Sequence, residues 1–127
     1  MDRQQVFDFA KQRYGTEPDY PWRDENAVLR HGDRKWYAVV LKVGRDKLGL
    51  EGNEIIDVIN LKCDPLLIGS LCTQDGFHRA YHMNKENWIS IRLDGSVAEE
   101  QIKNLMDLSY ELTKSKVKIG EKRQVIN

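Results

Sequence analysis

The sequence predicts an α+β fold, a two-layer sandwich in which helices lie against an antiparallel sheet. Segments rich in β-branched and aromatic residues are joined by short turns, as in hairpins. Segments with helix caps stand before, between and after them. Helices gathered among antiparallel strands are typical of two-layer sandwiches. Because we find no internal repeat or linker, we expect one domain over residues 1–115 and a basic C-terminal tail over residues 116–127.

The composition is ordinary for a globular protein. The chain has 127 residues, of which 20 are basic and 20 acidic, so its zero net charge provides no global attraction to nucleic acid or anionic lipid. No stretch fits a secretion signal or a membrane span. Cys63 and Cys72 lack the spacing of a disulfide framework or a zinc site, so we expect two reduced thiols. We therefore expect a cytoplasmic monomer with no cofactor, metal or membrane contact.

The N-terminal half is expected to contain one helix and three strands. Asp2 fits the first position of a capping box, so the first helix begins after it, and Gly15 ends that helix. Strands are predicted over 27–31, 36–43 and 55–62. The glycine-rich segment between the last two strands is expected to form a hairpin arm.

The C-terminal half is expected to contain a helix, a hairpin and a last helix. Asp64 caps the first of these helices, since aspartate is a good cap and proline follows it at the first helical position. Residues 77–81 and 88–93 are predicted to form the hairpin. Ser96 and Glu99 have the spacing of a second capping box, which opens the last helix. The inner face of that helix is expected to contain Ile102, Leu105, Met106, Ser109 and Leu112.

Five short patterns occur in a fixed order along the chain. They are Asp19-Tyr20-Pro21-Trp22 followed by Asp24-Glu25, Lys35-Trp36-Tyr37, Leu61-Lys62-Cys63-Asp64-Pro65, Tyr81-His82-Met83-Asn84-Lys85 with Trp88, and Ser109-Tyr110. In this order they resemble the MmcQ/YjbR-like family of bacterial proteins, and residues 69–78 depart from its pattern. The resemblance implies a double-wing, secretion-chaperone-like α/β sandwich, with DNA binding as its proposed role and no known target.

Two basic stretches are candidate DNA contacts. Residues 30–47 have six basic and two acidic side chains, and the tail from residue 113 has five and one, so each carries a net charge of +4 (six minus two, and five minus one). A basic arm and a basic tail can reach the phosphates of a duplex. The alternative is a solvated strand face and a solvated chain end. Weak, non-specific binding of duplex DNA would use Arg34, Lys35, Lys42, Arg45, Lys47, Lys114, Lys116 and Lys118.

The turn between the last two predicted strands is a second candidate site. It contains hydrogen-bond donors, a titratable ring and flat apolar surfaces, from Tyr81, His82, Asn84, Lys85 and Trp88. These groups suit a small molecule or a protein partner with a polar group. The competing interpretation is structural: Asn84 serves the turn, and His82 braces the end of the sheet against residues 18–22.

An enzyme is the least favoured of the alternatives. Cys63 follows Lys62 and precedes a helix, a position that lowers the pKa of a thiol, and His82 would then be its base. Cysteine is more often a small buried residue, and Asp64 is explained as a helix cap. We therefore expect a non-catalytic binding domain. Its first candidate ligand is DNA, and the alternative is a small molecule or protein partner at the 81–88 turn.

Overall fold

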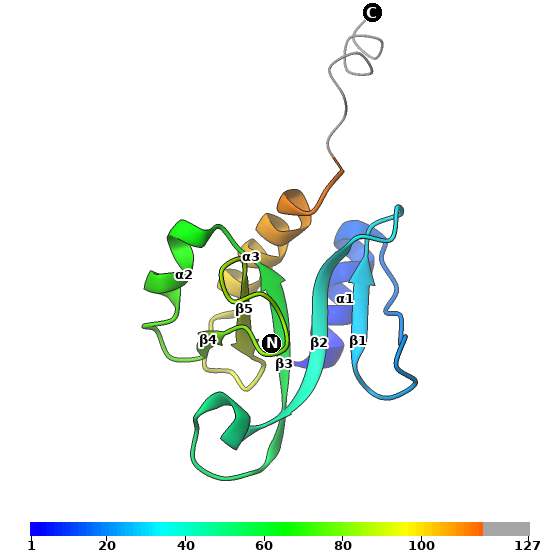
Figure 1. Cartoon of the computed structure of the whole chain (residues 1–127). Coiled ribbons are helices and arrows are strands. Elements are labelled where there is room, and N and C mark those ends of the chain that lie inside the picture. The colour runs from blue at the N-terminus through cyan, green and yellow to red at the C-terminus, as the bar shows by residue number, and fades with distance from the viewer. Residues whose placement is uncertain (116–127) are drawn as a thin grey trace, which may run out of the picture.

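A five-stranded antiparallel sheet with strand order β1-β2-β3-β5-β4 forms the centre of the structure (Figure 1). The computed structural model describes residues 1–115, so the predicted tail, with Lys116 and Lys118, lies outside the described residues. The strands are β1 (Ala27–Arg30), β2 (Trp36–Gly44), β3 (Ile55–Lys62), β4 (Phe77–Arg79) and β5 (Trp88–Arg92). The predicted positions of all five strands are confirmed.

Three α-helices supply side chains to the core on one face of the sheet. They are α1 (Arg3–Tyr14), α2 (Pro65–Leu71) and α3 (Glu99–Leu112), and the 3-10 helix η1 (Arg45–Leu48) follows β2. Val6, Ile68 and Ile102, one from each α-helix, belong to the same buried cluster as Val40 and Ile59 of the sheet. The predicted α+β sandwich is therefore confirmed. Among residues 1–115, no helix is both long and apolar enough to cross a membrane.

Both ends of α3 differ from the prediction. Ser96 is not its cap, because Ser96 donates its backbone N–H (3.0 Å) and its hydroxyl (2.5 Å) to the Asp94 carboxylate in a turn. The N-cap is Ala98, which has no side-chain bond to the helix. Leu112 is 42% exposed rather than buried, since the last turn of α3 projects beyond the sheet (Figure 1). The burial predicted for Ile102, Met106 and Ser109 is confirmed.

Ser109 connects α3 to the end of the β2–β3 pair. Its hydroxyl donates to the Tyr37 carbonyl at 2.5 Å and accepts from the Lys62 backbone N–H at 2.9 Å. Ala38 and Leu61 are the last paired residues of the β2–β3 ladder. The hydroxyl therefore bridges the next two backbone groups, where a direct ladder bond would otherwise form. Because Ser109 is fully buried, its hydroxyl takes the place of water as the hydrogen-bond partner of the Tyr37 carbonyl and the Lys62 N–H.

The other face of the sheet is covered by loops instead of helices. Tyr81 and Met83 of the loop after β4 pack on a second apolar cluster, together with Leu48 of η1. This cluster consists of Val28, Val39, Leu41, Val43 and Val58. A loop cover leaves gaps between the segments, and an apolar recess lined by Val39, Leu41 and Met83 lies at one of them.

A buried polar network holds this loop on the sheet. Asn60 donates from its side-chain nitrogen to the Tyr81 carbonyl at 2.7 Å. Ser90 donates its hydroxyl to the Asn60 side-chain oxygen at 2.6 Å and accepts from the Tyr81 N–H at 2.9 Å. Asn60 and Ser90 are fully buried and bonded, which makes the loop position specific.

Replacing Ser109 by alanine is expected to lower the free energy of unfolding by about 1–3 kcal/mol, because the Tyr37 carbonyl and the Lys62 N–H lose their partner. Chemical denaturation measures this loss. Asn104→Ala, an exposed change on the same helix, is the matched control and should shift stability by less than about 0.5 kcal/mol. A Ser109→Ala protein as stable as the wild type would contradict the bridging role.

Candidate functional site

The structure separates the five side chains of the predicted turn site instead of gathering them in one cleft. Tyr81 and Lys85 line a groove beside β4, His82 lines an apolar recess over β2, and Trp88 lines a hollow at the end of the sheet. Asn84 serves the turn, since its side-chain oxygen accepts a backbone N–H at 2.8 Å and its carbonyl accepts the Trp88 N–H at 3.0 Å. The predicted interpretation of Asn84 as a turn residue is therefore confirmed.

His82 does not brace the sheet. Its side chain is exposed and forms no hydrogen bond within the described part of the chain, and its ring lies 4.0 Å from that of Tyr81. Its backbone has a φ of 59°, a left-handed conformation that is uncommon outside glycine. Asn60 and Ser90 hold the loop instead. The predicted bracing role of His82 is wrong, because the network that fixes the loop uses the Tyr81 backbone.

The two thiols are not arranged for nucleophilic chemistry. Cys63 is buried in the core on the helix side of the sheet, and Cys72 is half-buried. Burial raises the pKa of both thiols. For Cys63 this is the opposite of the lowering that a position before a helix predicts. His82 borders the cluster on the opposite face of the sheet, so it cannot act as the base for Cys63.

A hollow of about 630 Å³ lies where the ends of β2, β3 and β5 meet the last turn of α3. We name it the lysine–tryptophan groove, and it is lined by Lys35, Trp36, Lys62, Trp88, Leu112, Thr113 and Lys114. Lys62 and Trp88 are direct partners in the β3–β5 register, so a cation and an indole stand side by side. Among residues 1–115, no carboxylate lines the groove. Lys35 and Lys62 form no ion pair within residues 1–115, whereas Lys114 contacts Glu111 at 2.9 Å.

The other predicted DNA contacts do not share this surface. Arg34 lies beside Lys35 in the β1–β2 turn, but Arg45 and Lys47 lie in η1, at the opposite end of β2 (Figure 1). Nine strand residues separate the two ends by roughly 30 Å. Lys42, between them, forms an ion pair with Asp57 at 2.9 Å. The hairpin arm and the start of the tail therefore do not form one continuous basic face.

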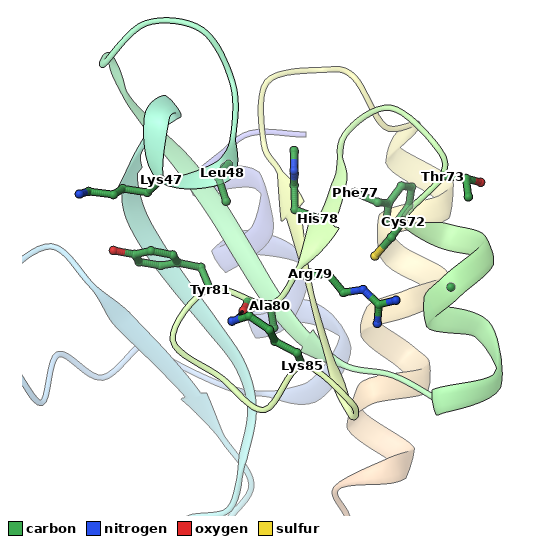
Figure 2. Close-up of a pocket in the computed structure, with 11 residues that line it drawn as sticks. Lys47, Leu48, Cys72, Thr73, Phe77, His78, Arg79, Ala80, Tyr81 and Lys85 are labelled. Carbon is green, nitrogen blue, oxygen red and sulfur yellow. Dashed lines mark hydrogen bonds between the residues drawn. The ribbon is translucent and has the colours of Figure 1, made fainter.

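A second cationic hollow, of about 570 Å³, lies beside the edge strand β4 (Figure 2). We name it the β4 groove. Lys47, Arg79 and Lys85 supply its positive charge, and its apolar surface comes from Leu48, Cys72, Phe77 and Ala80. In the described part of the chain, no carboxylate lines it. Lys47 and Arg79 form no ion pair within residues 1–115, and Lys85 donates from Nζ to the Ala80 carbonyl at 2.9 Å.

A buried arginine lies behind the β4 groove. Arg92 has a 9% exposed side chain and pairs with Asp75 at 2.9 Å and with Asp94 at 2.8 Å. Its Nη1 lies 3.1 Å from Nε2 of His78, a residue that lines the groove. Because arginine can only donate, Nε2 of His78 accepts and the ring is neutral. Burial, and then the charge of Arg92, lowers the pKa of His78.

Sequence reasoning missed several residues of these hollows. Lys62, Trp36 and Arg79 were not among the candidate site residues. Lys62 reaches Trp88 only through the β3–β5 register, which the sequence does not specify. The available signal was alternation along β3, which directs Lys62 to the face opposite the buried Leu61.

Comparisons with known proteins establish the family. The model of the YjbR family matches residues 11–112. The chain belongs to the YjbR family. The uncharacterized protein YyaQ of Bacillus subtilis (strain 168) is 43% identical over 117 residues, which cover 90% of this chain and 99% of that protein. The resemblance carried by the five sequence patterns is confirmed.

Solved structures of YjbR-like proteins share the fold. A crystal structure from Pseudomonas syringae is 44% identical, with a TM-score of 0.87, and covers 90% of this chain and 100% of that chain. A solution NMR structure from the same organism is 42% identical in sequence, with a TM-score of 0.83. The match covers 93% of this chain and 97% of the chain in that structure. The crystal structure of a Deinococcus radiodurans protein with a DUF419 domain is 22% identical in sequence, with a TM-score of 0.71. The match covers 98% of this chain and 87% of that protein's chain, and at this identity it supports the fold alone.

His82→Ala and Asn60→Ala are expected to differ sharply in stability. His82→Ala should change the free energy of unfolding by less than about 0.5 kcal/mol, as an exposed side chain without partners does. Asn60→Ala should lower it by about 1–3 kcal/mol, since the Tyr81 carbonyl and the Ser90 hydroxyl lose a buried partner. Thermal and chemical denaturation measure both. A large loss for His82→Ala would restore the bracing interpretation.

The stability of the fold is expected to fall as the pH drops below about 6.5, the ordinary histidine pKa. Burial is the main cause of the lowered pKa of both His31 and His78. The unfolded chain therefore binds protons there first, and the folded chain only at lower pH, so acid favours unfolding. Melting curves between about pH 7.5 and about pH 5 measure the slope. His78→Gln should reduce it.

Proposed function

We propose that this YjbR-family protein is a non-catalytic, cytoplasmic nucleic-acid-binding domain that holds DNA in the lysine–tryptophan groove. The observation that carries the proposal is a hollow with three lysines, two indoles and no carboxylate. Lysines neutralise phosphates and release counterions, which supplies the affinity of non-specific binding. Indole faces stack on the unpaired bases of a single strand, whatever the identity of the base. The groove therefore has lysines for the phosphates of DNA and indoles for its bases, but no group that distinguishes one base from another.

The sequence beyond the groove supports the same ligand. Lys114 lines the groove, and the chain continues from it with Lys116, Lys118, Lys122 and Arg123 in its sequence. The basic tail thus starts beside the lining lysines. Because the net charge of the whole chain is zero, the attraction is local and is screened beyond about 8 Å at physiological salt. Weak binding that depends strongly on salt follows from these few contacts.

The arm at the other end of β2 takes a minor part in this proposal. Arg45 donates from Nε to the Glu51 carbonyl at 2.9 Å, and Lys42 is paired with Asp57. Lys42 lies in β2, and η1 itself contains no tryptophan. These cations therefore add charge to the molecule without the stacking surface that distinguishes the lysine–tryptophan groove.

We expect the double variant Lys35→Gln/Lys62→Gln to lose most of the DNA affinity. About three phosphate contacts imply a fall of roughly 40-fold between about 50 mM and about 200 mM salt, and losing two lysines should reduce the salt slope by about 2. Fluorescence anisotropy with labelled duplex and single-stranded DNA measures both. Arg45→Gln/Lys47→Gln removes the same charge at the opposite end of β2 and is the matched control.

Three outcomes decide the proposal. A wild-type protein that binds neither form of DNA at low salt would refute it. Equal losses in the two double variants would show that charge alone matters and would remove the groove from the explanation. A larger loss at the groove, with quenching of tryptophan fluorescence on binding, would support both the phosphate and the stacking contacts.

A further inference from the structure

We infer that the β4 groove is a separate binding site for a small amphipathic anion, a molecule with an apolar or aromatic body and one carboxylate or phosphate group. The inference does not depend on DNA binding, because it rests on different residues. Its basis is the combination of an apolar surface with three cations and no carboxylate in one hollow (Figure 2).

The groove has the shape of a ligand site. Its volume of about 570 Å³ falls within the range of small-molecule pockets, roughly 300–1,000 Å³. Its walls come from η1, α2 and the 80–85 turn, which surround β4 on different sides (Figure 2). Phe77 and Cys72 belong to the core cluster on the helix face of the sheet, whereas Leu48 packs on the cluster of the opposite face, so the groove runs around the free edge of β4. The apolar side chains on the two sides of this edge suit a planar or aliphatic body.

The charge of the groove is uncompensated, unlike that of three arginines elsewhere in the chain. Arg13, Arg30 and Arg92 each have a carboxylate partner within 3.1 Å. Arg79 is exposed and has none within residues 1–115, and the same holds for Lys47. An anion would therefore meet donors that no side chain of the described protein occupies.

Two of the cations, whose charged ends point to different sides of β4 in Figure 2, can each bind an anionic group. Arg79 reaches from β4 toward α2 (Figure 2) and carries a planar guanidinium, which binds a carboxylate or phosphate with two parallel hydrogen bonds. Lys85 is held by its bond to the Ala80 carbonyl at 2.9 Å, so its ammonium is already positioned and keeps two further protons to donate. Pre-positioned donors lower the entropy lost on binding.

The groove binds and does not react. The thiol of Cys72 is neutral, because burial raises its pKa, so it is a poor nucleophile. His78 is neutral and its Nε2 is engaged by Arg92 at 3.1 Å. The described lining therefore contains no activated nucleophile and no histidine that is free to act as a base. We expect a bound anion to be released without chemical change.

NMR titration of the ¹⁵N-labelled protein tests the site with three probes: 1-naphthyl phosphate, the neutral 1-naphthalenemethanol and inorganic phosphate. The amphipathic anion is expected to shift the amides of residues 47–48, 72–73 and 77–81 and to bind more tightly than either of the other probes. Arg79→Gln and Lys85→Gln should each weaken it about tenfold, the loss of one charge-assisted contact. Lys35→Gln, in the lysine–tryptophan groove, is the matched control and should not change it.

Each alternative outcome would overturn the inference. Equal binding of the neutral alcohol would remove the role of the cations, and equal binding of inorganic phosphate would remove the role of the apolar side chains. Shifts confined to residues around Trp88 and Lys114 would place the anion in the other groove. Because Arg79 is exposed, its variant should melt like the wild type, so a lost affinity reports on the ligand contact. DNA binding by Arg79→Gln should persist, which separates this site from the proposed function.

Discussion

The hydroxyl of Ser109 is the constraint on which the end of the sheet depends. By bonding to the Tyr37 carbonyl and the Lys62 N–H, it ends the β2–β3 ladder and ties α3 across it. Tyr37 then packs among the helices, with its ring 5.0 Å from that of Tyr110. The neighbouring Trp36 packs on the opposite cluster. Alternation along β2 and β3 at this bond places the Trp36 indole and the Lys62 side chain on the face opposite Tyr37 and Leu61, at the rim where the lysine–tryptophan groove forms.

The distribution of charge gives this neutral chain two local anion-attracting surfaces. Several cations are used in structure: Lys42 pairs with Asp57, and Arg92 joins Asp75 to Asp94 behind β4. The cations that remain without an ion-pair partner within residues 1–115 include Lys35 and Lys62 of one groove and Lys47, Arg79 and Lys85 of the other, whereas Lys114 pairs with Glu111. The net charge of the protein is zero, but many of its acidic side chains lie beside cations elsewhere on the surface. Places that contain cations without nearby acidic groups can therefore attract anions at short range.

Local signals in the sequence predicted most of the fold, and long-range geometry accounts for what they missed. The caps at Asp2 and Asp64 depend on neighbouring residues alone, and both are present. Ser96 was misjudged because Asp94 competes for its hydroxyl, and Leu112 because its burial depends on where the sheet ends. For the site, the residue types around the 81–88 turn were informative, but successive loop residues face different hollows. Their grouping depends on the register of β3, β4 and β5, which no local pattern fixes.

The same register explains how two cationic sites can be close without merging. Arg79 pairs directly with Ile89, so both point to the face on which Ile89 is buried against the helices. Trp88 is the next residue along β5 and therefore points to the other face, beside Lys62. The sheet itself separates the guanidinium of one groove from the indole of the other. Both hollows are open, one at the end of the sheet and one along the edge strand β4, so a ligand in either would be held mainly by its charge and by the apolar side chains beneath it.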